Sequence, residues 1–103
     1  MARRAATKMK KAVYNRALQV VGSVVRKWDP YSLIASGAPA DEFASEIASV
    51  VAQIPRIKTE EEAVLALSRV FSSAFDAVRF SPENSSEAGK KLFAALSASG
   101  FVD

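Results

Sequence analysis

Three carboxylates, Asp41, Glu42 and Glu46, lie close together in the sequence and have the residue types for cation chemistry. Glu42 and Glu46 are four residues apart, so a helix would place both on one face. Three carboxylates on one face can bind a hard cation such as Ca²⁺ or Mg²⁺. The alternative is a solvated, acidic helix start, where the helix dipole favours negative charge. We adopt this alternative and expect no metal and no cofactor.

The chain contains neither histidine nor cysteine. It therefore lacks the commonest general acid or base, the commonest metal ligand, and any thiolate site. Serines are plentiful, but no histidine can activate them. A Ser–Lys pair would need a buried lysine, and no lysine falls on an apolar stripe of the sequence. We expect no catalytic residue and no enzymatic activity.

Charge divides the chain near Trp28. Residues 1–27 carry eight Lys or Arg and no acid (+8), whereas residues 28–103 carry six bases and all eleven acids (−5), giving a net charge of +3. A basic segment can contact the phosphates of nucleic acid, although no helix-turn-helix signature or interleaved aromatic residue accompanies this one. The same face can equally be solvated only. The candidate phosphate contacts are Lys8, Lys10, Lys11 and Arg16.

The acids of the second part can instead face a basic partner protein. Complementary charge speeds association and selects partners. Because the net charge is positive, such an acidic surface must be local. We expect it to come from the second and third helices and from the loop after Trp28. The candidate partner-binding residues are Tyr31, Asp41, Glu42, Glu46, Glu60 and Glu61.

Four segments position these residues, because apolar side chains recur in each at three- and four-residue steps. The pattern predicts helices over about 9–28, 40–54, 59–80 and 86–98. The apolar stripes expected to be buried run from Val13 and Tyr14 to Trp28, from Phe43 to Ile54, from Val64 to Val78 and from Leu92 to Leu96. Four helices with short connections indicate an all-α, compact, single-domain bundle. Gly22, inside the first helix, offers a position where another helix can approach closely.

Local signals define the helix ends. Pro39 suits the first turn of the second helix, and Pro55 should stop that helix. Thr59, followed three residues later by Glu62, forms a capping box at the start of the third. The fourth helix has N-cap candidates in residues 84–86, and Gly100 is its expected C-cap.

Trp28-Asp29-Pro30 is the expected structural anchor. Pro30 disfavours helical geometry at the preceding residue, so the first helix should end there. Asp29 can accept from neighbouring backbone N–H groups, and the Trp28 ring should fold into the core. Tyr31, Leu33 and Ile34 should pack over the core as a lid.

No apolar run approaches the ~20 residues that a membrane-spanning helix needs, so we expect no membrane span. An Arg-rich, acid-free N-terminus also occurs in mitochondrial transit peptides, but the apolar stripe continues through this one as far as Trp28. We therefore expect a flexible basic N-terminus over residues 1–8, a single helical domain over residues 9–103, and a cytoplasmic location.

The segment that begins at Trp28-Asp29-Pro30 resembles a known family. Trp28-Asp29-Pro30, Gly37-Ala38-Pro39 and Asp41-Glu42-Phe43 with Glu46 are similar to the pattern of the YugE-like group, small uncharacterised bacterial proteins. The stretch from Val70 through Phe80-Ser81-Pro82-Glu83 is similar too. The likeness covers about residues 13–97. This chain departs from the pattern in its long basic start and in Phe43, where tyrosine is frequent.

The resemblance implies a small all-α protein and brings no established activity. Similar small domains accompany bacterial toxin systems as immunity proteins. The sequence thus predicts a non-enzymatic protein-interaction module, whose partner could be a cognate toxin. The first alternative is a small nucleic-acid-associated or regulatory protein that uses the basic N-terminal helix, and the second is a domain that self-associates through an apolar face.

Overall fold

The computed structural model describes residues 10–33, 35–39 and 41–102, and these form four α-helices with no strand. The helices and two short 3-10 turns follow in the order α2 (Lys11–Trp28), η1 (Pro30–Ser32), α3 (Ala44–Gln53), η2 (Ile54–Arg56), α4 (Glu60–Ala74) and α5 (Ser86–Ala98). This architecture confirms the predicted all-α bundle. The predicted flexible segment 1–8 lies outside the described residues.

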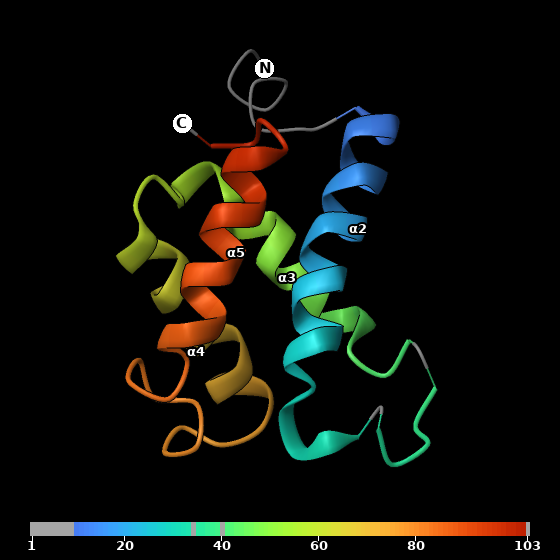
Figure 1. Cartoon of the computed structure of the whole chain (residues 1–103), viewed down its shortest axis with the longest axis vertical. Helices are drawn as coiled ribbons and strands as arrows, with labels where there is room; N and C mark the ends of the chain where they lie inside the picture. Colours follow the sequence, from blue (N-terminus) through green and yellow to red (C-terminus); the bar gives the residue numbers. More distant parts are fainter. Residues whose placement is uncertain (1–9, 34, 40, 103) are drawn as a thin grey trace.

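The four helices pack in a ring (Figure 1). α2 contacts α3 on one side and α5 on the other, and α4 likewise lies between α3 and α5. The most extensive contact between two helices is that of α4 with α5. None of the helices in the described residues is long and apolar enough to cross a membrane.

The core occupies the centre of this ring and comes from the apolar stripes of all four helices. α2 contributes Ala17, Val21 and Val25, whereas Val13 and Tyr14 on the predicted stripe are exposed. The whole predicted stripe of the second helix is buried, from Phe43 to Ile54. The largest fully buried side chains are Phe43, Phe71, Leu67, Leu92, Leu96, Val21, Val25, Val50 and Val51.

The second helix starts later than predicted. Pro39 does not lie in its first turn, because the segment before Ala44 forms turns instead: Glu42 N–H donates to the Pro39 carbonyl (3.0 Å) and Ala44 N–H to the Asp41 carbonyl (3.0 Å). These turns insert the Phe43 ring against Phe71, with ring centroids 6.0 Å apart. Burial of the Phe43 ring therefore outweighs the preference of Pro39 for the first turn of a helix. At its other end α3 stops at Gln53, before Pro55, as predicted.

The third helix is shorter than predicted, because α4 ends at Ala74 and residues 75–80 fold back as a loop. The Asp76 carboxylate accepts from Val78 N–H (2.8 Å) and Arg79 N–H (3.3 Å). An aspartate that bonds the backbone two and three residues ahead competes with helical hydrogen bonding. We call residues 75–80 the return loop.

Two predicted helix caps are present. The Thr59 hydroxyl accepts from Glu62 N–H (3.1 Å), while the Glu62 carboxylate accepts from Lys58 N–H (2.8 Å), one residue earlier than in a standard capping box. At the end of α5, Gly100 has φ +81°, and Phe101 N–H donates to the Leu96 carbonyl (2.9 Å), which is the Schellman arrangement.

The atoms nearest to a Cβ at Gly22 belong to its own helix. A Cβ there would lie 2.8 Å from the guanidinium nitrogens of Arg26, on the same helix. The close helix approach is at Gly89 on α5, where a Cβ would lie 2.6 Å from the Cα of Val64 on α4. Gly89 therefore explains why α4 and α5 pack so closely.

Candidate functional site

The backbone after α2 turns sharply through three left-handed residues that are not glycine. Asp29, Tyr31 and Ser32 have φ values of +47°, +64° and +54°, each of which costs about 1 kcal/mol or more. Asp29 N–H caps the helix by donating to the Val25 carbonyl (2.8 Å). The Asp29 carboxylate accepts from Ala35 N–H (2.9 Å), which closes the turn and confirms its predicted backbone role.

Aromatic contacts hold this turn in place. The Trp28 ring meets Phe71 and Phe80 edge-on, with centroids 5.0 and 5.6 Å apart. Tyr31 meets Phe75 and Phe80 edge-on at 5.7 and 5.5 Å. Trp28 is partly buried rather than fully inside the core. Within the predicted lid, Tyr31 remains 38% exposed, Leu33 packs against the core, and Ile34 lies outside the described residues.

Serine hydroxyls fix the return loop on the other side of the site. The Phe80 carbonyl accepts from Ser68 (2.6 Å), Ser72 (3.1 Å) and Ser85 (3.2 Å). Ser68 and Ser72 are one turn apart on α4, so they share a face, and Ser85 immediately precedes α5. The Asn84 amide adds a hydrogen bond to the Val78 carbonyl (3.1 Å). Asn84 therefore stabilises the loop instead of capping the fourth helix.

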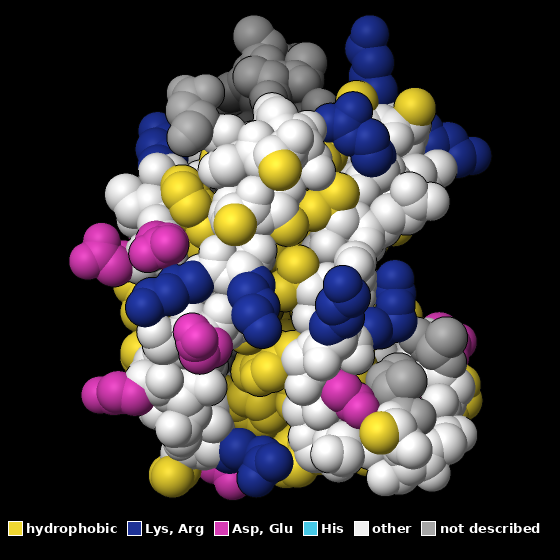
Figure 2. All heavy atoms as spheres, in the orientation of Figure 1, with side chains coloured by type: hydrophobic (Ala, Val, Ile, Leu, Met, Phe, Trp, Pro, Cys, Tyr) yellow, Lys and Arg dark blue, Asp and Glu magenta, His cyan; other side chains and the backbone are white. Residues whose placement is uncertain are grey.

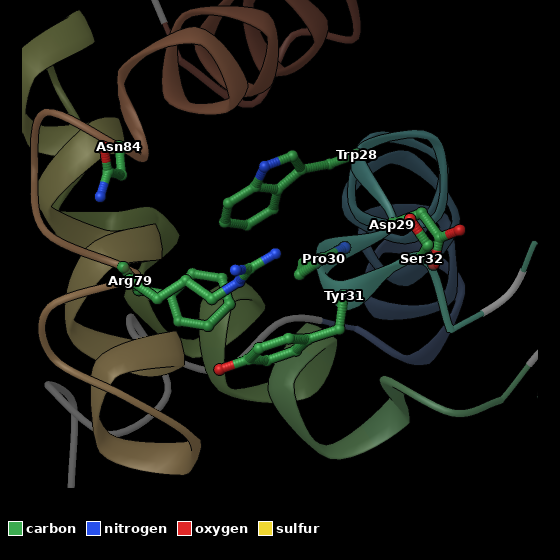
Figure 3. A pocket seen from close by; sticks show the side chains of 8 residues that line it. Trp28, Asp29, Pro30, Tyr31, Ser32, Arg79 and Asn84 are labelled. Carbon is green, nitrogen blue, oxygen red and sulfur yellow. The ribbon is translucent and has the colours of Figure 1, made fainter.

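Between the turn and the return loop lies an open cleft of about 420 Å³. We call it the corner cleft; Trp28, Pro30, Tyr31, Arg79, Phe80 and Asn84 are among its lining residues. Figure 3 shows the Arg79 guanidinium between the rings of Trp28 and Tyr31, while Asp29 points away from them. The Arg79 Cζ lies 4.3 Å from the centroid of the Tyr31 ring.

Apolar side chains are exposed beside this cleft. Phe75 is 42% exposed and Val78 81% exposed. Tyr31 contacts Phe75 ring to ring and lies under the Arg79 guanidinium, and Val78 directly precedes Arg79 in the return loop. We call Tyr31, Phe75, Val78 and Arg79 the corner surface. It combines aromatic rings with an arginine, a composition enriched at protein interfaces.

The predicted acidic site does not form one patch. Asp41 and Glu42 are exposed in the turn before α3, and Glu46 lines a hollow with residues at the C-terminal end of α4. Glu60 and Glu61 lie in the first turn of α4. The length of α4 separates the two groups by about 20 Å. The described residues include no group of three acids placed to hold a metal ion.

The described residues among the candidate phosphate contacts also lie in different surroundings. Lys10 and Lys11 are exposed at the start of α2, and Lys8 lies outside the described residues. Arg16 binds the C-terminal end of α5: its guanidinium donates to the Ser99 carbonyl (2.6 Å) and lies 4.8 Å from the centroid of the Phe101 ring. Arg16 therefore has a structural role in joining the two ends of the described chain.

Of the predicted partner-binding residues, the structure places only Tyr31 at the corner cleft. Arg79, Phe75 and Val78 were missed, because the apolar periodicity of the third helix predicted a buried stripe continuing to Val78. One feature of the sequence indicates that the third helix ends before Asp76. Asp76 lies two and three residues before the N–H groups that it accepts from, a spacing typical of turns.

The fold and this site define a small all-α bundle with an open aromatic cleft at one end. Comparison with family models, with curated proteins and with solved structures finds no match for this chain. The resemblance to the YugE-like family thus stays a prediction from its residues.

Proposed function

We propose that this protein is a non-enzymatic module that binds another protein through the corner surface. The observation that carries the proposal is the exposure of Phe75, Val78 and Tyr31 next to Arg79. Apolar side chains grouped on a surface indicate a binding site more often than single exposed ones do. Aromatic and arginine side chains also contribute most of the binding energy at many interfaces.

The corner surface is held in position before any partner arrives. The Phe80 ring supports Tyr31, and three hydroxyls fix the Phe80 carbonyl. A preformed surface loses little side-chain and loop entropy on binding, so more of the contact energy becomes affinity. This rigidity supports binding as the function.

The specific form of the proposal is a bacterial immunity protein that binds and blocks a cognate toxin in the cytoplasm. It rests on the resemblance to the YugE-like group. In this form the toxin contacts the corner surface. The predicted acidic residues, which lie in two separate groups, have at most a peripheral role. Blocking is then steric, and the chain needs no catalytic residue.

Identification of the neighbouring gene and a pull-down with its product test this form. If that gene encodes a toxin, isothermal calorimetry should detect binding of the toxin domain. Val78→Asp should weaken binding about tenfold or more, because it places a charge in an apolar contact. Val78 is mostly solvated, so the variant should fold normally.

Val13→Asp supplies the matched control, since Val13 is an exposed valine on α2, away from the corner cleft. It should bind like the unaltered chain. Equal weakening by both variants would exclude the corner surface as the contact. Failure of the toxin domain to bind at all would remove the immunity form of the proposal.

The nucleic-acid alternative rests on the basic N-terminal helix. Its candidates Lys10 and Lys11 are exposed, but Arg16 already binds the Ser99 carbonyl. Among the described residues, the candidates that remain are Lys10 and Lys11, and two cations offer few phosphate contacts. Protein binding is therefore the function that the geometry supports better.

A further inference from the structure

A second hollow shares Trp28 with the corner cleft. A groove of about 370 Å³ lies between α2 and α5, and Trp28 lines both this groove and the corner cleft. The indole ring thus forms part of the wall of two adjoining hollows. We call these two hollows together, with Trp28 as the residue that both share, the α2–α5 channel. Its extent is suited to a short peptide segment rather than to a single side chain.

The α2–α5 channel has an apolar floor and a cationic rim. Val24, Trp28, Ala88 and Ala95 line the groove part, with Lys27 of α2 and Lys91 of α5 beside them. Arg79 lies in the corner cleft. Figure 2 shows Lys and Arg side chains in a band across α5 and α2, above a hollow with hydrophobic side chains at its base.

Two acids, Asp29 and Glu87, also line the channel. The Asp29 carboxylate points away from Arg79 and accepts from Ala35 N–H. Glu87 lines the groove part beside Lys27 and Lys91. Three cations therefore line the channel against two acids, one of which points away from Arg79, so its field favours an anionic occupant.

Arg79 is arranged to receive a carboxylate. Its guanidinium lies over the Tyr31 ring and, among the described residues, makes no hydrogen bond or ion pair. A guanidinium held over a ring keeps its N–H groups free at the edge of its plane, where they match the two oxygens of a carboxylate. The aromatic contact reduces the rotamer entropy that binding would otherwise cost.

We propose that the α2–α5 channel binds an acidic peptide segment of the partner protein, with an apolar side chain between two carboxylate-bearing residues. One carboxylate meets Arg79, the apolar side chain packs on Trp28, and the other carboxylate lies between Lys27 and Lys91. This inference rests on the proposed function and adds the chemistry of the partner.

Single-stranded nucleic acid fits the channel less well. A strand carries a phosphate at every nucleotide, so it cannot confine its charge to the few positions where the cations lie. Three cations provide few of the contacts that give nucleic-acid binding its affinity. A peptide can instead place its charges only where the cations are.

Heteronuclear NMR of the whole chain tests the proposal with defined probes. The probe is the blocked hexapeptide Asp-Glu-Leu-Phe-Glu-Asp, and its control is Asn-Gln-Leu-Phe-Gln-Asn, which has the same shape without charge. At about 0.05 M salt, where screening is weak, the acidic peptide should shift the Trp28 indole N–H and the Arg79 side-chain N–H signals and approach saturation at millimolar concentration. The neutral peptide should shift them much less.

Substitutions locate the contact. Arg79→Gln should weaken binding of the acidic peptide about fivefold, whereas Arg69→Gln, at an exposed arginine of α4, should leave it unchanged. A second pair of variants removes the same number of positive charges at two different places. The double variant Lys27→Gln/Lys91→Gln should weaken binding, while Lys10→Gln/Lys11→Gln should not, because Lys10 and Lys11 do not line the channel.

Equal weakening by both double variants would show a general charge effect and overturn the proposal. Stronger shifts of the same signals by a ten-nucleotide poly-uridine strand would also overturn it, in favour of nucleic acid. If a partner binds the corner surface but Arg79→Gln and the Lys27/Lys91 variant both leave its affinity unchanged, this inference fails while the proposed function stands. If the acidic peptide binds but Val78→Asp leaves partner binding intact, the proposed corner contact fails instead.

Discussion

At the scale of single residues, the backbone carbonyl of Phe80 organises the candidate site. It accepts from the hydroxyls of Ser68, Ser72 and Ser85, which come from α4 and from the start of α5. Ser68 and Ser85 are buried polar residues, and buried hydroxyls without a partner would be costly. These three serines therefore have a structural role in holding the return loop.

Ser68→Ala should lower the free energy of unfolding by about 1–2 kcal/mol, since it removes a buried hydrogen bond. Ser72→Ala should cost less, because Ser72 is only partly buried and its hydrogen bond is longer. Ser73→Ala is the control, at the exposed neighbour on the same helix. Urea denaturation monitored by Trp28 fluorescence measures all three, and equal stability of the Ser68 and Ser73 variants would contradict this role.

At the scale of elements, the helices agree with the sequence where local signals and burial act together. The stripe of α3 is buried throughout, and the cap formed by Thr59 and Glu62 is present. The prediction failed where a tertiary contact opposed the local preference. Phe43 is buried at the expense of a helix start at Pro39, and the return loop replaces the predicted end of the third helix.

The pairing of α4 with α5 depends on Gly89, which no sequence signal identified. Gly89→Ala should destabilise the fold by about 1–3 kcal/mol, because the new Cβ would overlap the Val64 backbone and overpacking has costs of this size. Gly22→Ala should be neutral or stabilising by up to about 1 kcal/mol, since alanine favours helix and the Arg26 side chain can move aside. Thermal unfolding of the two variants measures the contrast. Destabilisation of both by the same amount would mean that Gly89 has no special role in packing.

At the scale of the whole molecule, the described residues of the basic N-terminal part and of the acidic second part share surfaces. Lys27 of the basic half lines a groove together with Lys91 of the second half. Arg16 joins α2 to the residues after α5, through the Ser99 carbonyl and the Phe101 ring. Folding thus disperses part of the charge that the sequence concentrates at the N-terminus.

This dispersal predicts weak binding to nucleic acid. At about 0.15 M salt, where exposed charges are largely screened beyond about 8 Å, the chain should not be retained on duplex DNA or on RNA. Fluorescence anisotropy with labelled oligonucleotides, from low salt upward, measures this. Micromolar binding that persists at 0.15 M, about the physiological ionic strength, would favour the nucleic-acid alternative.

The sequence by itself determined the helices, the burial of most of their stripes, and the end of α2 at the Trp28 corner. These features depend on periodicity, on proline and on capping side chains, which act over a few residues. Only the tertiary structure decided that Phe75 and Val78 are exposed, that Arg79 lies over Tyr31, and that Trp28 lines two adjoining hollows. Each of these depends on which distant segments meet: the return loop reaches the corner because hydroxyls from α4 and from the start of α5 hold the Phe80 carbonyl. No local sequence pattern predicts this tertiary contact, so the candidate site could be identified only in the folded chain.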